Sequence, residues 1–436
     1  MKHSQYILCF LLTLSFYFSK SQSNKIDDLL KSAQQNVDQK IFNRAIQQLD
    51  SVLDVDPKNE PALVLLAKVN ARLNDANAAL MIYQKLCLDS TNSQYRYGRA
   101  SCLAQLYKFE ASLLDYNYLI QHHANDTNVI FERAVAYSEL GNLEMALKDY
   151  HRVMELNSKY EGLYYNMAYL QADNKLYQEA VLNYNKAIEQ NPNDTDAYVN
   201  RALAKIEIDQ VKSAIEDCDK VLKLNKNHVS ALVARATAYS QIQKANEALL
   251  DLNKALLLDN QRAEVFMDRA YILLDLKKTK SALYDFNQAI QLDSNFIEAY
   301  VGRAYCYESF NQHALAIKDY DVCVRLDSSN SQAFNLRGMA YFEIKNYSAA
   351  IMDINKAIQL NPQDAELFYN RVICLMAMKK YPEALLDCDK AIAMNPNDSL
   401  YYLERAKVHL AMGHKSLHQN DLTKAKELDA LNKPSK

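Results

Sequence analysis

Nine arginines in this sequence each stand 16 residues before an aspartate. The arginines are Arg99, Arg133, Arg201, Arg235, Arg269, Arg303, Arg337, Arg371 and Arg405, and their aspartates are Asp115, Asp149, Asp217, Asp251, Asp285, Asp319, Asp353, Asp387 and Asp421. A guanidinium and a carboxylate that meet form charge-assisted hydrogen bonds. At three corresponding places both partners are replaced together, by Ser32 with Gln48, Leu66 with Ile82 and Met167 with Asn183. Joint loss predicts a structural ion pair formed within one repeated segment and not between neighbouring segments. Two independent charge preferences on solvated faces are the alternative.

Residues for catalysis or metal binding do not accompany these pairs. The nine histidines are scattered, no Cys-x-x-Cys occurs, and His122-His123 has no third ligand near it in the sequence. Six glycines in 436 residues leave no phosphate-binding loop. We therefore expect no catalytic residues, no cofactor or cofactor-binding residues, and no metal site.

The pairs belong to a repeat about 34 residues long. A small residue recurs at Ala33, Ala67, Ala100, Ala134, Ala168, Ala202, Ala236, Ala270, Ala304, Gly338 and Ala406, with Val372 as the exception. A second alanine follows 12 residues later in most copies, as Ala214 follows Ala202. The copies fill 26–432, leave a tail at 433–436, and begin near residues 26, 60, 93, 127, 161, 195, 229, 263, 297, 331, 365 and 399. A fixed period of this length indicates a repeat protein whose copies bury their apolar faces against their neighbours.

Each repeat carries two apolar stretches with helical spacing. In one copy these are Tyr198, Ala202 and Ile206, followed by Ala214, Cys218 and Val221. Turn formers and helix caps such as Asn191-Pro192-Asn193-Asp194 separate the copies. Small residues allow two helices to cross at close distance. The pattern predicts an all-α fold built from helix pairs.

These residues resemble the tetratricopeptide repeat family. The resemblance rests on Tyr198-x-x-Arg201-Ala202, then Ala214 and Val221, and on a closing proline such as Pro192. It extends over 26–432. It implies a right-handed superhelical solenoid of about twelve helix-turn-helix repeats, with an inner groove that binds peptides or protein segments.

In that family geometry the groove is lined by sites three residues before and one residue after the first small residue. The candidate partner-binding residues there are Tyr97, Phe131, Tyr165, Tyr169, Met267, Tyr271, Tyr305, Met339 and Tyr369. Acidic residues such as Asp196, Glu264, Glu298 and Glu366 flank them. An apolar groove with acidic rims suits an amphipathic or basic segment. Alternatively, neighbouring first helices cover much of this surface as packing.

These features favour a non-catalytic protein–protein interaction scaffold or adaptor over an enzyme. A groove-based small-ligand carrier or enzyme accessory subunit is the alternative, and an enclosed pocket with convergent polar groups would favour it. The formal charge is −3, with acids and bases interspersed, so the basic surface that nucleic acid requires is missing.

Eight cysteines include Cys9, and the other seven stand at packing positions of the repeats. We therefore expect them to be mostly thiols. Two disulfides are geometrically conceivable, Cys306–Cys323 and Cys374–Cys388, because each would join the two helices of one repeat.

Residues 1–23 differ from the repeats. Lys2 and His3 precede an apolar run from Tyr6 to Phe18, which small polar residues follow. This is typical of a secretory signal peptide, and the alternative is an uncleaved anchor. The run is shorter than the roughly 20 residues that cross a bilayer, so we expect a secreted or periplasmic protein without a stable membrane span after cleavage.

The mature protein is therefore expected to begin between Ser21 and Lys25 and to lie outside the cytoplasm. N-terminal sequencing of the native product is the direct measurement. An intact Met1 on protein recovered from the membrane fraction would contradict cleavage.

Overall fold

The computed structural model describes residues 22–88 and 91–431. All regular structure in these ranges is helical, which confirms the predicted all-α solenoid of helical repeats. The helices form two compact units, divided between Ile208 and Asp209. The predicted signal peptide, except its last two residues, and the predicted tail at 433–436 lie outside the described residues.

The N-terminal unit begins with a helix over 22–38. It continues with α2 (Phe42–Val55), α3 (Glu60–Arg72), α4 (Ala76–Leu88), α5 (Ser93–Gln105), α6 (Phe109–His122), α7 (Thr127–Glu139), α8 (Leu143–Leu156), α9 (Leu163–Asp173), α10 (Tyr177–Gln190) and α11 (Thr195–Glu207).

The C-terminal unit contains the remaining helices, and odd numbers mark the first helix of each repeat. They are α12 (Val211–Leu224), α13 (Val229–Gln241), α14 (Ala245–Leu258), α15 (Ala263–Asp275), α16 (Thr279–Leu292), α17 (Ile297–Ser309), α18 (His313–Leu326), α19 (Ser331–Glu343), α20 (Tyr347–Leu360), α21 (Ala365–Ala377), α22 (Tyr381–Met394), α23 (Ser399–Ala411) and α24 (Lys415–Leu431).

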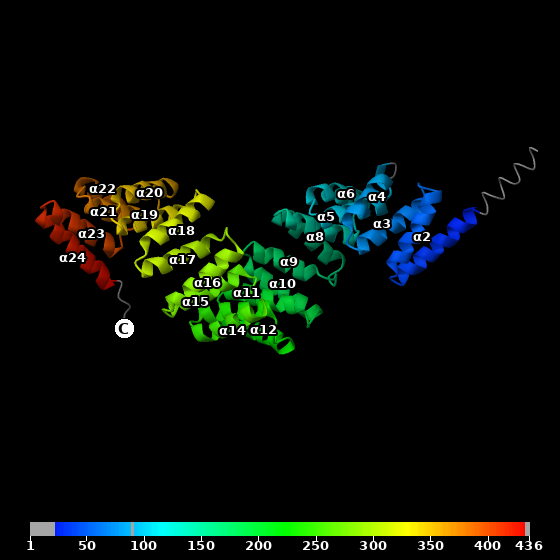
Figure 1. Cartoon of the computed structure of the whole chain (residues 1–436), viewed down its shortest axis with the longest axis horizontal. Helices are drawn as coiled ribbons and strands as arrows, with labels where there is room; N and C mark the ends of the chain where they lie inside the picture. Colours follow the sequence, from blue (N-terminus) through cyan, green and yellow to red (C-terminus); the bar gives the residue numbers. More distant parts are fainter. Residues whose placement is uncertain (1–21, 89–90, 432–436) are drawn as a thin grey trace, which may run out of the picture. The chain divides into compact units, whose positions relative to one another are not determined.

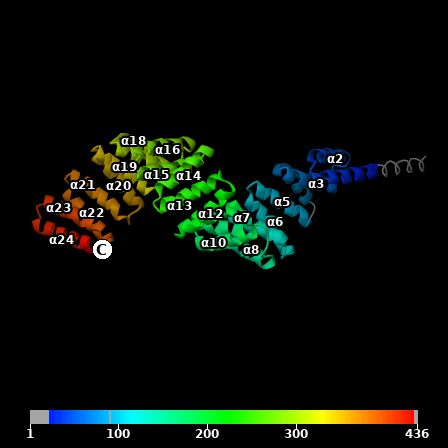
Figure 2. The ribbon, with the colours of Figure 1, turned by 90° about the horizontal axis from the view of Figure 1, so that it is seen from below.

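Within each unit a first helix packs against the second helix of its own repeat, and that helix packs against the next first helix. Figures 1 and 2 show these helices in sequence order as adjacent pairs. The recurrent alanines, such as Ala236 and Ala248, are almost fully buried where the helices cross. At Gly338 an added Cβ would come 2.9 Å from the Ile354 side chain, so an alanine at this crossing would require that side chain to shift.

The turn inside each repeat depends on one residue in the left-handed conformation. This residue lies seven positions after the first small residue of the repeat, and it ends the first helix as an αL cap. Glycine supplies it only at Gly141 and Gly413, and elsewhere a residue with a side chain does so. Lys175, Lys277 and Lys345 have φ values of 62°, 58° and 61°. The sequence analysis predicted a turn between the two helices of each repeat but did not identify this left-handed residue, because most copies lack the glycine that usually marks one.

Between repeats, polar side chains cap the first helices as the sequence predicted. Asp126 accepts hydrogen bonds from the backbone N–H groups of Asn128 and Val129, and Asp194 accepts one from that of Ala197. These bonds satisfy donors that a helix N-terminus leaves unpaired.

The predicted arginine–aspartate pairs are present in the eight repeats where both members lie in one unit. In each, Nε and Nη2 donate to the two carboxylate oxygens over 2.6–3.0 Å. The aspartates are buried, so the parallel bonds compensate a charge that would otherwise be costly. The ninth pair, Arg201 and Asp217, has one member in each unit and stays a prediction.

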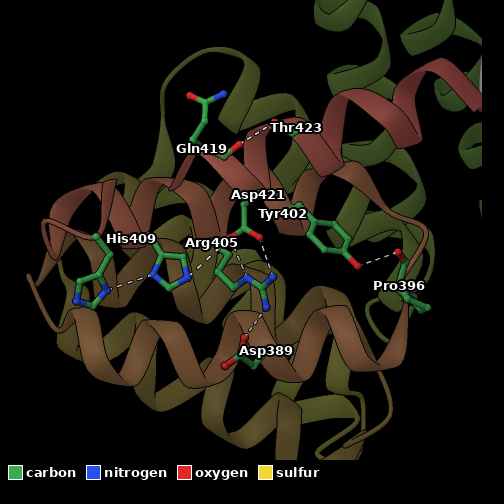
Figure 3. Close-up of polar contacts among 9 residues, drawn as sticks. Asp389, Pro396, Tyr402, Arg405, His409, Gln419, Asp421 and Thr423 are labelled. Atoms are coloured by element: carbon green, nitrogen blue, oxygen red, sulfur yellow. Dashed lines mark hydrogen bonds and ion pairs between the residues drawn. The ribbon is translucent and has the colours of Figure 1, made fainter. Parts of the chain in front are cut away.

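The same guanidinium also reaches the preceding repeat, which the sequence analysis did not foresee. Arg235 Nη1 donates to Asp219 Oδ1 at 2.5 Å, and Arg269 Nη1 donates to Asn253 Oδ1 at 2.8 Å. The same contact recurs from Arg133 to Asn117, Arg201 to Asn185, Arg303 to Asn287, Arg337 to Asp321, Arg371 to Asn355 and Arg405 to Asp389. Figure 3 shows Arg405 between Asp421 of α24 and Asp389 of α22. We call this three-residue arrangement the arginine clamp.

Two of the repeats without the ion pair replace it with neutral hydrogen bonds. Gln48 donates to Ser32 and accepts from Asn36, each over 2.7 Å. Asn183 donates to Gln171 at 2.8 Å. Coupled replacement therefore removes both charges and leaves neither one buried alone.

The cysteines of the described residues are free thiols, as predicted: Cys87, Cys102, Cys218, Cys306, Cys323, Cys374 and Cys388. Burial raises the pKa of the Cys218 thiol to about 12, which makes it unreactive at neutral pH.

Within the described ranges no helix has both the length and the apolar character needed to cross a membrane.

We expect Arg235 and Asp251 to show strong coupling in a double-mutant cycle read by urea unfolding. Either Arg235→Met or Asp251→Asn alone should cost up to about 3–5 kcal/mol, while both together should cost much less than the sum. The first variant leaves the Asp251 carboxylate buried without its partner, and the second removes the charge that compensates the guanidinium inside the repeat, so that Arg235 keeps its ion pair with Asp219 alone. Asp219→Asn is the matched control. It keeps an oxygen acceptor at an exposed site, as Asn253 does naturally, and should cost about 1 kcal/mol or less. Strictly additive effects at Arg235 and Asp251 would refute the pairing.

Candidate functional site

The nine predicted partner-binding residues lie on first helices of both units, four in the N-terminal unit and five in the C-terminal unit, and we call the surface that they form within each unit the first-helix face. Tyr169, Tyr271 and Tyr305 are 54%, 40% and 56% exposed, and they share the repeat position one residue after the small residue. The other six, Tyr97, Phe131, Tyr165, Met267, Met339 and Tyr369, are half-buried. The three tyrosines that follow the small residue are thus exposed, whereas Met339 at the same position and the five residues three positions before it are half-buried.

The half-buried rings rest on aromatic side chains of second helices. Tyr165 meets the buried Tyr184 edge-on with ring centroids 5.9 Å apart, and Phe131 lies 5.8 Å from Tyr150. In the C-terminal unit, Tyr271 contacts Phe286 in the same way at 5.3 Å. These contacts fix the rings, so binding to them requires little further ordering of side chains.

A second row of polar residues lies two positions before the small residue. Asn200 donates to the Tyr165 hydroxyl at 2.9 Å, and Asn370 donates to Asn335 at 3.0 Å. Glu404, in the same row, accepts from Lys407 at 2.7 Å. The sequence analysis did not select this row, although it stands four residues after the acidic flank and so shares its helix face.

Two acids of this row lack a compensating charge. Burial raises the pKa of Glu132, and burial together with the nearby Glu264 raises the pKa of Asp268 to about 6. Among the described residues no cation or hydrogen-bond donor lies against the Asp268 carboxylate. The acidic flanks Asp196, Glu264, Glu298 and Glu366 are exposed. This part of the surface is therefore negative as well as aromatic.

A large cavity borders the face in the N-terminal unit. It encloses about 1110 Å³, and its lining includes Tyr165 and Asp196 together with Lys159, Lys186 and Glu189. α9 begins only at Leu163, after Gly162 in the left-handed conformation with φ of 77°, so this first helix is 11 residues long where its neighbours have 13.

In the described part of the chain, no group of three or more histidine, cysteine, aspartate or glutamate side chains is placed so that it could hold a metal ion. The side chains named on the first-helix face are aromatic rings, amides and carboxylates, which suit non-covalent recognition.

We expect Asp268→Asn to stabilise the protein at neutral pH. Because the folded pKa of Asp268 is raised to about 6 from an ordinary 3.8, folding disfavours the ionised form. Removing that charge should raise the free energy of unfolding by about 1–2 kcal/mol at pH 7.5, and the gain should shrink as the pH falls through 6 towards 4. Urea unfolding across this pH range is the measurement.

Asp259→Asn serves as the control of opposite sign. The pKa of Asp259 is lowered because it accepts hydrogen bonds from the Gln261 backbone and from Arg262. Its replacement should destabilise the protein at pH 7.5. Equal behaviour of the two variants would contradict the account of Asp268.

Comparison with known proteins agrees with this geometry. Three tetratricopeptide repeat models match, one at 128–160, 162–194 and 297–330, one at 183–216 and one at 331–364. A search of curated proteins found no match.

Several solved structures match the chain in the comparison. The APC/C hetero-tetramer Cut9–Hcn1 is 16% identical, with 94% of both chains covered and a TM-score of 0.47. YrrB, described as a TPR protein with an unusual peptide-binding site, is 26% identical over 45% of this chain and 97% of its own, with a TM-score of 0.38. A tetratricopeptide repeat protein from Parabacteroides merdae is 21% identical over 54% of this chain and 93% of its own, with a TM-score of 0.46. The family matches, together with the regular helix pairs and their small crossing residues, show that the chain is a tetratricopeptide repeat protein.

Proposed function

We propose that this protein is a non-catalytic scaffold or adaptor that binds a protein or peptide segment on its first-helix face. Proteins of this repeat family serve in general as protein-interaction scaffolds. The observation that carries the proposal is the set of three exposed tyrosines, Tyr169, Tyr271 and Tyr305, at one repeat position. Exposed rings that recur in register offer large contact area at low entropic cost.

The partner segment is amphipathic or basic. The rings offer apolar area, while the exposed carboxylates of Glu264, Glu298 and Glu366 offer negative charge on the same helices. Complementary charge speeds encounter and excludes acidic partners. Lys407 departs from this pattern, since it stands at the tyrosine position of α23 and pairs with Glu404.

Binding takes place outside the cytoplasm in this proposal. Its support is the apolar run from Tyr6 to Phe18 with Lys2 before it, which is typical of an export signal. A secreted or periplasmic scaffold of this kind gathers protein segments at the cell envelope or beyond it.

The test is affinity capture from the native host with the full chain, followed by binding measurements on the captured partner. Tyr165→Ala with Tyr169→Ala should weaken binding by about 2 kcal/mol or more, roughly 30-fold, because buried aromatic anchors dominate such interfaces. Unfolding curves of the variant check that the loss of the Tyr165–Tyr184 contact does not unfold the protein.

The matched control removes two tyrosines outside the face. Tyr107 and Tyr284 are 81% and 59% exposed and do not belong to the first-helix face. Tyr107→Ala with Tyr284→Ala should leave affinity unchanged. A partner that is lost with the control pair, and kept with the first pair, would show that binding occurs elsewhere.

A further inference from the structure

A small cavity opens on the first-helix face in the C-terminal unit. It holds about 140 Å³ between α13 and α15, and its lining includes Thr237, Ser240, Asp268, Tyr271 and Asp275. Carboxylates, hydroxyls and one aromatic ring thus surround a space of side-chain size.

The cavity has a local cause in the sequence. Its lining includes Leu252, which stands four residues after the second alanine of its repeat. The next two repeats have Phe286 and Tyr320 at that position. Phe286 fills the equivalent space so closely that a Cβ at Gly302 would come 2.2 Å from its ring. Leu252 is shorter than either ring. Space therefore remains beside Asp268, which stands at the repeat position that Gly302 holds in the next repeat.

The Tyr271 ring is held as a wall of this cavity. It packs edge-on against Phe286 at 5.3 Å, and its hydroxyl donates to the Glu298 carbonyl at 3.2 Å. The ring is nevertheless 40% exposed. A fixed and accessible aromatic face attracts cations.

Another repeat of this chain shows which group forms an ion pair with an acid at this position. In α23 the equivalent of Asp268 is Glu404, which is 8% exposed, and Lys407 donates to it at 2.7 Å. Lys407 stands at the position that Tyr271 occupies in α15. In α15 the acid is therefore present, and the internal cation is replaced by an aromatic ring beside an open space.

We propose that this cavity receives a cationic side chain, arginine or lysine, from the protein segment bound on the first-helix face. This proposal rests on the proposed function, and it adds the site that recognises a basic residue of the bound segment. The Asp268 carboxylate accepts hydrogen bonds from the cation, the Tyr271 ring faces it, and Thr237 and Ser240 offer hydroxyl oxygens at the rim.

Binding at this site decreases in acid. The cation pairs with ionised Asp268, and the pKa of that carboxyl is about 6 in the free protein. The other charged groups around it are Glu264 and Asp275 on α15 and Glu298 on α17, all acidic, while α13 contributes Thr237 and Ser240 and α14 contributes Leu252. Protonation of any of these acids lowers the attraction, so the groups act in the same direction.

The experiment uses the full chain with ¹³C-labelled tyrosine rings and N-acetyl-arginine methylamide as the probe. Tyr271→Phe assigns the Tyr271 resonance. The matched neutral probe is N-acetyl-citrulline methylamide, which has nearly the same shape without the charge. We expect a saturable shift of the Tyr271 resonance with the arginine probe at pH 7.5, none with the citrulline probe, and weaker binding at pH 5.

Asp268→Asn should weaken the arginine probe by about tenfold, as expected for the loss of a hydrogen bond to a charged group. Equal shifts with both probes, or unchanged affinity in Asp268→Asn, would overturn the cation site. If the site fails in this way while partner capture still depends on Tyr165 and Tyr169, the proposed function stands without it. If the probe binds but capture does not depend on the first-helix face, the proposed function fails and the cation site remains.

Discussion

The buried aspartate of each second helix is the constraint on which the rest of the fold depends. A carboxylate removed from water must be paired and hydrogen-bonded, or it destabilises the fold by several kcal/mol. The arginine–aspartate pair meets this need in the eight repeats where both members lie in one unit, with two parallel bonds to each aspartate. Because both bonds are directional, they also fix how the first helix is rotated and shifted against the second.

The third bond of the clamp extends this constraint from one repeat to the next. Nη1 of Arg235 binds Asp219 of the preceding second helix, so one side chain holds three helices. The recipient varies between Asn and Asp, and the aspartates among them are about half exposed. A single oxygen acceptor is sufficient there, whereas the buried site requires a full carboxylate. Aromatic residues such as Phe368 lie against the clamp, with the Arg371 guanidinium 5.5 Å from its ring centroid.

The clamp also determines what the first-helix face presents. Arginine directly precedes the small residue, and the exposed tyrosines directly follow it, so fixing the arginine against two second helices also fixes the direction of the tyrosines. In this direction Tyr271 keeps an edge-on contact with Phe286 of α16 while part of its ring stays exposed, and Tyr305 is exposed as well. Asp268 and Leu252 take no part in the clamp, and they differ from their equivalents Gly302 and Phe286 in the next repeat.

Much of the fold could be predicted from the sequence, because its main features recur at the same position in most repeats. The period of the small residues gave the helix pairs, and the joint loss of Arg and Asp in three repeats gave the ion pair. The contact from Arg235 to Asp219 was missed because its recipient alternates between two residue types. The cavity beside Asp268 was missed because it arises from one leucine that replaces a ring in a neighbouring repeat, and single departures carry no periodic signal.

The division of the first-helix face into packed and exposed rings also needed the structure. Tyr165 and Tyr169 are the same residue type one helical turn apart, yet Tyr184 and Asn200 cover the first and leave the second open. Sequence spacing places both on one face, and only the contacts from neighbouring helices separate them.

Native-state hydrogen exchange on Arg235→Met tests the central claim that one guanidinium couples neighbouring repeats. The account predicts that amide protection falls together in α12, α13 and α14, since the variant loses its bonds to Asp219 and to Asp251 at once. Loss of protection confined to α13 and α14, with α12 unchanged, would contradict coupling between repeats and reduce the clamp to a contact within one of them.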